Sequence, residues 1–190
     1  MNEIDTMHIT SDFDSGNIIC LKADAPDDIK LAIQKDNQSD FYQWFHFCLS
    51  GAKGQACVMT IENASGAAFT GGWEDYNSCA SYDKTNWFRV PTEFINGELV
   101  IAHTPEQDAV YYAYFAPYTM ERHAELIARS VQCKGVLATV LGQTLDGQNL
   151  DKLTIGTPAS GKKVLWLIAR QHPGESMAEW WMDGFLGALL

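Results

Sequence analysis

Hydrophobic and polar positions alternate along the first part of the chain, in stretches of period two that are rich in aromatic residues. This alternation is typical of β-strands with one face in a core. Five segments share the pattern: KLAIQKD (30–36), FYQWFHFCLSG (41–51), QACVMTIEN (55–63), RVPTEFINGELVIAHTP (89–105) and AVYYAYFAPY (109–118). Asn96-Gly97 separates two apolar runs and predicts a hairpin turn. Several short strands separated by turn signals predict that residues 1–118 form an antiparallel β-sandwich.

The pattern changes after Tyr118 and predicts a second, α/β domain over residues 119–190. TMERHAELIARSVQ favours a helix with Thr119 as its N-cap, and GVLATVLGQTLDGQNLDKLTIG favours two strands that turn near Asp146-Gly147. KKVLWLIA (162–169) is a continuous apolar run, as expected for a strand buried on both faces of an α/β sheet. Pro117 stops the preceding strand and marks the boundary between the domains.

The last segment, from Met177 to Leu190, predicts a helix that is apolar around nearly its whole circumference. Glu179 and Asp183 are its only charged residues, so we expect the helix to be buried. It ends without a glycine or asparagine cap and without a basic residue in its last turn. We therefore expect the chain to be the N-terminal part of a longer protein that supplies the packing partners of this helix.

Composition and charge narrow the classes of function. The chain is 46% hydrophobic and 19% charged, typical of a globular protein, and it has neither a signal-peptide pattern nor an apolar run long enough for a membrane span. Its formal charge of −11 lies wholly in residues 1–120, which argues against nucleic acid as a partner. Five cysteines without a Cys-x-x-Cys pair indicate a reducing, cytoplasmic location and structural roles.

A candidate metal site follows the apolar run, in the sequence Arg170-Gln-His172-Pro-Gly-Glu175. In open α/β sheets, ligands bind near the carboxyl ends of buried strands. Imidazole and carboxylate are both zinc donors, and Pro173-Gly174 would form a turn that brings His172 and Glu175 together. Glu175 would lie near the positive end of the last helix. The spacing alone leaves open whether His172 and Glu175 are ligands or a chance pair.

The segment ARQHPGES, placed after VLWLI, resembles the zinc-binding motif of the carboxypeptidase-A-like metallopeptidases, in the His-Pro-Gly-Glu form of the cytosolic carboxypeptidase branch. YYAYFAPYTMERHAELI is similar to the join between the N-terminal β-sandwich and the peptidase domain in that branch. WFHFCLSG and NWFRVPT resemble segments of the same sandwich. The similarity covers most of the chain.

The resemblance implies a zinc metallocarboxypeptidase that removes C-terminal residues from peptides or proteins. His172 and Glu175 would be ligands of one Zn²⁺, and Arg170 would bind substrate or shape the site; a solvated charge at a strand end is the alternative for Arg170. The third histidine ligand, the substrate-binding arginines and the general-base glutamate would follow Leu190. Some relatives take acidic residues, including side-chain-linked glutamates, for which the −11 charge would require a local basic pocket.

The other titratable residues have structural interpretations. His8, His46, His103 and His123 precede the motif, whereas the third ligand of the family follows it, so we expect structural or surface roles for them. Glu179 lies one helical turn beyond Glu175, and we expect it to be a helix-surface charge or a support for the site rather than the general base.

Two other functions remain open. The chain would be a non-catalytic β-sandwich binding or scaffold protein if its peptidase part were an inactive remnant. A zinc deacylase acting on small acyl amino acids would also use His-x-x-Glu, but the long N-terminal sandwich argues against it. The sequence after Leu190 would discriminate, because an active peptidase needs a further histidine, arginines and a late glutamate.

Overall fold

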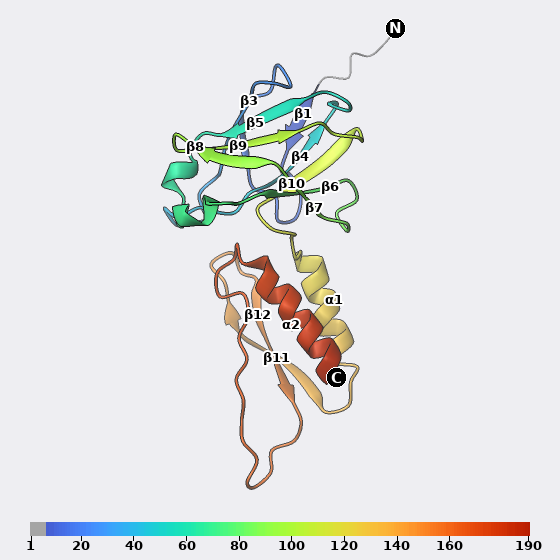
Figure 1. Ribbon diagram of the computed structural model, residues 1–190. Coiled ribbons are helices and arrows are strands. Elements are labelled where there is room, and N and C mark those ends of the chain that lie inside the picture. Colours follow the sequence, from blue (N-terminus) through green and yellow to red (C-terminus); the bar gives the residue numbers. More distant parts are fainter. Residues whose placement is uncertain (1–6) are drawn as a thin grey trace. The chain divides into compact units, whose positions relative to one another are not determined.

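A computed structural model describes residues 7–190, and the chain divides into two compact units, Met1–Pro117 and Tyr118–Leu190 (Figure 1). Within residues 7–117, the first unit contains two five-stranded sheets and two short 3₁₀-helices. The second contains two helices and a two-stranded sheet. The expected fold class, a β-sandwich followed by the start of an α/β unit, is therefore confirmed.

The ten described strands of the first unit are divided equally between the two sheets. One sheet has the order β1 (His8–Thr10), β4 (His46–Ser50), β10 (Ala109–Ala113), β6 (Ser78–Ser81), β7 (Phe88–Val90). The other has the order β2 (Ile19–Lys22), β3 (Ile29–Ala32), β5 (Cys57–Ile61), β9 (Glu98–His103), β8 (Thr92–Ile95). The 3₁₀-helices η1 (Ala64–Gly66) and η2 (Thr70–Trp73) follow β5.

The strand pairing departs from the prediction at one place, since β3 and β5 run parallel whereas the other described ladders are antiparallel. Parallel neighbours need a long crossover connection rather than a tight turn. Here the connection passes through β4 in the other sheet.

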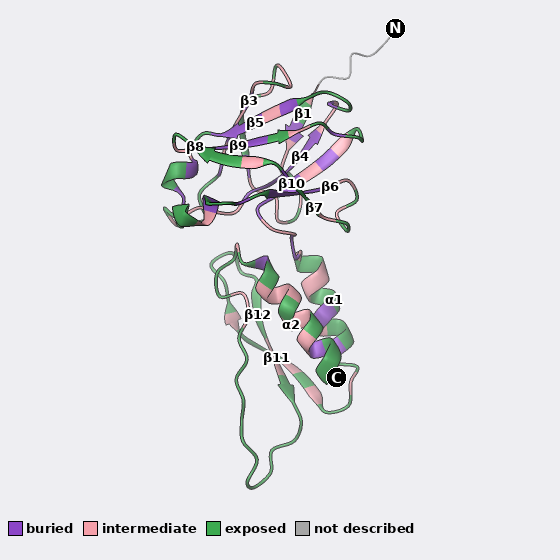
Figure 2. Ribbon diagram, viewed as in Figure 1, coloured by how far each residue is buried: buried purple, intermediate pink, exposed green. Residues whose placement is uncertain are grey.

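The two sheets enclose one hydrophobic core, which Figure 2 shows as buried segments along the strands. The alternation of β3 is visible in its burial, because Ile29 and Leu31 are fully buried while the residues between and after them are partly exposed. Phe47 of β4 is fully buried and stacks on Tyr112 of β10, with ring centroids 5.2 Å apart. Burial of such aromatic side chains is the main stabilising contribution to a sandwich of this size.

The predicted hairpin is present between β8 and β9. Ile95 pairs with Glu98, so Asn96 and Gly97 form a two-residue loop. Both have positive φ angles, 54° and 88°, as a type I′ turn requires.

His46 lies on the face of β4 opposite Phe47 and is fully buried. Its Nδ1 is 3.0 Å from the hydroxyl of Ser15. Its Nε2 has no hydrogen-bond partner within residues 7–190. Aromatic rings surround the imidazole: Phe13, Trp44, Trp87 and Tyr111. Burial, and secondarily the charge of Lys84, lower the pKa of His46 to about 3, so the imidazole is neutral in the folded chain.

We predict that His46 makes the first unit sensitive to acid. Because its folded pKa lies below the value of about 6.5 in an unfolded chain, its neutral form contributes stability above pH 6.5 that is lost as the pH falls towards 3. The free energy of unfolding should fall by an additional ~1.4 kcal/mol per pH unit in this window. Urea denaturation of His46→Gln between pH 4 and 7 should lack this component, with His8→Gln as the control. Equal pH slopes for His46→Gln and the wild type would contradict the prediction.

The second unit begins with helix α1 (Met120–Ser130), whose N-cap is Thr119 as predicted. The Thr119 hydroxyl accepts a hydrogen bond from the backbone N–H of Arg122. Strands β11 (Val136–Gln143) and β12 (Asn149–Ile155) then form an antiparallel hairpin, and helix α2 (Ser176–Leu189) ends the unit. Tyr118, Leu126 and Leu186 form its small buried core.

The prediction of a buried strand over residues 162–169 is wrong. This segment has no regular secondary structure and forms part of the long connection between β12 and α2 (Figure 1). Val164 and Trp166 are 81% and 70% exposed. Apolar sequence favours burial, but a strand also needs a neighbour for its backbone groups, and no strand within residues 7–190 pairs with this run.

The prediction that helix α2 is buried all round is also wrong for this structure. Of its residues only Ser176 and Leu186 are buried. Met177, Trp181 and Leu189 are exposed, because the side of the helix that carries them is not covered by any described residue. No helix within residues 7–190 has the length and apolar character needed to cross a membrane.

Candidate metal centre

The segment His172–Glu175 forms a tight turn immediately before helix α2. The backbone N–H of Glu175 donates to the carbonyl oxygen of His172 at 3.0 Å, and Pro173 and Gly174 occupy the two central positions. Proline favours such a turn because its ring fixes φ. Glu175 is the N-cap residue of α2, but its side chain accepts no capping hydrogen bond from the helix. The carboxylate therefore remains available as a metal ligand.

The turn brings the two predicted ligands together. Nδ1 of His172 lies 3.1 Å from Oε1 of Glu175, and the side chains are 79% and 52% exposed. With bonds of about 2.0–2.1 Å, two donors on one tetrahedral zinc ion lie ~3.3 Å apart, so the observed separation fits a shared ion. Within residues 7–190 no third histidine, cysteine, aspartate or glutamate joins them to complete a cluster.

Arg170 lies beside this turn and is held by three hydrogen bonds. Its Nε donates to the carbonyl oxygen of Pro173 at 3.0 Å, and Nη1 donates to the carbonyl oxygen of Tyr118 at 2.8 Å and to Oε2 of Glu179 at 2.6 Å. The side chain is only 22% exposed. The guanidinium is therefore bonded to the protein at three points and is not surrounded by solvent.

Glu179 and His123 extend the contacts from the turn into the rest of the second unit. The other oxygen of Glu179 lies 2.6 Å from Nδ1 of His123 on α1, and Nε2 of His123 lies 3.0 Å from Oδ2 of Asp151 on β12. Burial alone would raise the pKa of Glu179, but hydrogen bonds from His123 and Arg170 outweigh it and lower the pKa. The hydrogen bond to Glu179 raises the pKa of His123 despite its partial burial.

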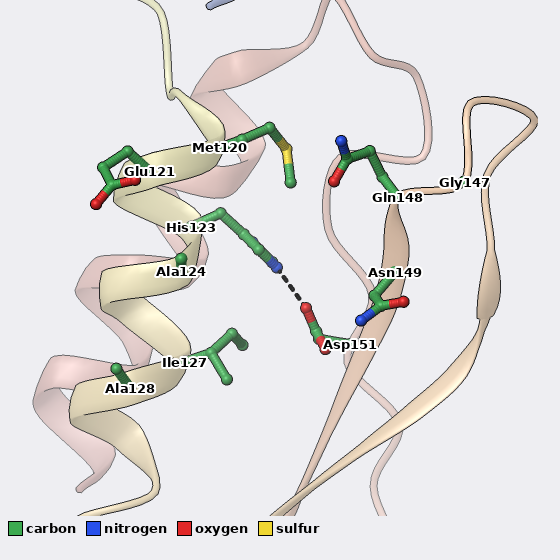
Figure 3. A pocket seen from close by; sticks show the side chains of 10 residues that line it. All are labelled: Met120, Glu121, His123, Ala124, Ile127, Ala128, Gly147, Gln148, Asn149 and Asp151. Atoms are coloured by element: carbon green, nitrogen blue, oxygen red, sulfur yellow. Dashed lines mark hydrogen bonds and ion pairs between the residues drawn. The ribbon is translucent and has the colours of Figure 1, made fainter.

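A groove of about 510 Å³ opens between α1 and the β11–β12 hairpin, and Figure 3 shows the side chains that line it. His123 and Asp151 point towards each other across the groove. Met120 and Ile127 of α1 supply apolar parts of the wall. The His123–Asp151 pair therefore lines part of the groove, and His123 also contacts Glu179.

The remaining histidines and the cysteines lie apart from this turn in the sequence and mostly in the first unit. His8 is exposed on β1, and Nδ1 of His103 on β9 lies 2.8 Å from the hydroxyl of Tyr112. All five cysteines are free. Cys48 and Cys57 are buried in β4 and β5, as expected for small apolar groups.

Sequence reasoning did not identify the network of Arg170, Glu179 and His123. One signal pointed to it, because Glu179 is one of two charges in a helix that is otherwise apolar. A charge in such a helix is expected to face a partner. The other charge, Asp183, likewise accepts a hydrogen bond from Tyr118 at 2.9 Å and pairs with Arg129.

Residues 9–115 match the family of the cytosolic carboxypeptidase N-terminal domain. An uncharacterized protein of Zymomonas mobilis is 50% identical over 97% of this chain, and the alignment covers 47% of that protein. The chain thus spans about half the length of this relative.

Solved structures of metallo-carboxypeptidases have the same fold. The enzyme from Burkholderia cenocepacia is 49% identical, with a TM-score of 0.91 over 95% of this chain and 48% of that chain. The enzyme from Pseudomonas aeruginosa, in complex with (2-guanidinoethylmercapto)succinic acid, is 40% identical, with a TM-score of 0.89 over 95% of this chain and 48% of that chain.

Proposed function

Since the chain belongs to the family of the cytosolic carboxypeptidase N-terminal domain, we propose that it is part of a zinc-dependent metallocarboxypeptidase in which His172 and Glu175 are two ligands of one zinc ion. The observation that carries the proposal is the 3.1 Å approach of His172 Nδ1 to Glu175 Oε1 on an exposed turn. An imidazole and a carboxylate at this separation match the donor types of catalytic zinc sites. A cytosolic location agrees with five free cysteines.

The chain's own residues would contribute the first half of the site. Zinc, when bound, supplies a Lewis acid for the scissile carbonyl and lowers the pKa of a coordinated water towards about 7. The imidazole of His172 and the carboxylate of Glu175 would hold the ion at the N-terminal end of α2. The third ligand and the general base would come from residues outside this chain.

The substrates would be the C-termini of peptides or proteins. The Pseudomonas aeruginosa neighbour binds a compound with a succinic acid group, which carries two carboxylates. This supports a site that recognises a C-terminal carboxylate, whereas the basic guanidinium group of the same compound gives no support for acidic side chains. The formal charge of −11 would oppose acidic substrates at long range, so their recognition would depend on a local basic pocket.

Metal analysis and peptide hydrolysis test the proposal. The whole protein that contains this chain should hold one zinc per molecule, release C-terminal residues from peptides, and lose this activity reversibly with 1,10-phenanthroline. The 190-residue chain alone should bind zinc weakly and hydrolyse nothing, because two protein ligands do not complete a catalytic site. Turnover by the chain alone would contradict the prediction that the third ligand and the general base lie outside it. A whole protein that releases no C-terminal residue would favour the binding or scaffold alternative.

A further inference from the structure

The guanidinium of Arg170 bonds to three parts of the second unit: the turn itself, the start of α1 and the first part of α2. Nε reaches the carbonyl of Pro173, inside the turn, whereas Nη1 reaches the carbonyl of Tyr118 and the carboxylate of Glu179. The planar guanidinium fixes the relative directions of its N–H groups, so these contacts define an orientation as well as a distance. A flexible lysine ammonium does not reproduce this arrangement.

The backbone of Arg170 supports the same interpretation. Its φ angle is +53°, in the left-handed region that residues with a Cβ seldom adopt. Such a conformation is strained and persists where the surrounding contacts determine it. The bend at Arg170 ends the exposed connection and directs the chain into the turn, so the side-chain bonds and the backbone bend act on the same few residues.

Glu179 connects the arginine to the rest of the unit. It lies four residues after Glu175, and hence one helical turn further along α2. One of its oxygens binds Arg170 and the other binds His123, which in turn binds Asp151 of β12. A continuous set of charge-assisted hydrogen bonds therefore links the turn to both helices and to the hairpin.

We propose that Arg170 is a positioning residue that, through Pro173, Tyr118 and Glu179, holds the His172–Glu175 turn in the conformation that presents both ligands to one metal ion. The proposal rests on the metal site proposed above. It assigns Arg170 a different role from substrate binding, because a substrate carboxylate would have to compete with Glu179 for Nη1. It likewise gives Glu179 the role of binding and orienting Arg170, and not a role in proton transfer.

Cobalt binding to the 190-residue chain measures the effect on the metal site. Arg170→Gly removes the guanidinium but still permits a positive φ, so it isolates the side chain from the backbone bend. It should weaken Co²⁺ binding about 10-fold or more, as loss of a residue that orients metal ligands typically does.

Three further variants test the same contact. Arg170→Lys should fail to restore the affinity, and Glu179→Gln should weaken binding in part. In a double-mutant cycle, the effects of Arg170→Gly and Glu179→Gln should be less than additive. Lys163→Ala removes a positive charge from the same connection and should bind as the wild type does.

Amide hydrogen exchange in the absence of metal gives a second readout. The N–H of Glu175 is bonded across the turn to His172, so its exchange should be ~10-fold faster in Arg170→Gly and unchanged in Lys163→Ala. Wild-type cobalt affinity and unchanged exchange in Arg170→Gly would overturn the positioning role and leave the zinc site intact. Absence of metal binding by the wild-type chain, with faster exchange in Arg170→Gly, would overturn the metal site while showing that the arginine holds the turn.

Discussion

In the whole protein that contains this chain, His172→Ala is expected to abolish zinc uptake while leaving the first unit folded. The substitution removes one of the two donors that this chain supplies to the proposed three-ligand site, and the remaining ligands do not hold the ion against dialysis. In the whole protein, the same change should reduce hydrolysis to background, because the metal supplies the Lewis acid of the proposed reaction. Elemental analysis after dialysis measures the metal content, and far-UV circular dichroism reports the sheets.

His8→Ala is the matched control, since it removes an exposed histidine from strand β1 of the first unit. Its zinc content should equal that of the wild type. If His172→Ala retained the wild-type zinc content, His172 would not be a ligand.

Phe47→Ala is expected to destabilise the β-sandwich by about 3–5 kcal/mol, the usual effect of removing a buried phenylalanine ring. Phe47 is fully buried in a strand between two neighbours, β1 and β10, and its ring stacks on Tyr112. The cavity would lie between the two sheets, where rigid strands limit relaxation. A loss of this size is a large fraction of the free energy of unfolding of a typical domain.

Urea denaturation followed by tryptophan fluorescence measures this loss. Phe94→Ala on the edge strand β8 is the control, because that ring is 38% exposed and its removal should cost less than 1 kcal/mol. Equal losses for the two variants would show that Phe47 is not a central core residue.

Strands β3, β4, β5, β8, β9 and β10 were predictable from sequence because their partners lie in the same part of the chain, whereas β1, β2 and β6 lie outside the predicted segments. β3 and β9 bury alternate residues, β5 buries all but Val58, and the Asn96-Gly97 turn carries its own conformational signal. The parallel pairing of β3 with β5 was not predictable in this way, because alternation fixes which face is buried and not the direction of the neighbouring strand.

The failures in the second unit have one physical cause. Residues 162–169 and helix α2 are apolar enough to be buried, yet burial needs a covering surface, and the described residues provide little of it. Sequence hydrophobicity indicates a tendency to be buried but does not supply the partner. Local signals succeeded in the same unit, since the Thr119 cap and the β11–β12 hairpin depend on near neighbours.

In the candidate site, too, the contacts between near neighbours were predictable and the contacts between distant residues were not. Proline and glycine predicted the turn between His172 and Glu175, because four consecutive residues are sufficient to form it. The bonds from Arg170 to Tyr118 and from Glu179 to His123 join residues 52 and 56 positions apart. Spacing along the sequence carries no signal for such contacts; they follow from the packing of α1 against α2.

The order of the strands has a consequence for how the sandwich folds. The chain passes from one sheet to the other six times between β1 and β10, and the β3–β5 ladder closes only after β4 has been placed in the opposite sheet. Neither sheet is a contiguous stretch of sequence, so neither forms a separate folding intermediate made of local hairpins. We expect the sandwich to appear in a single cooperative step and slowly, with the high contact order that delays β-rich topologies.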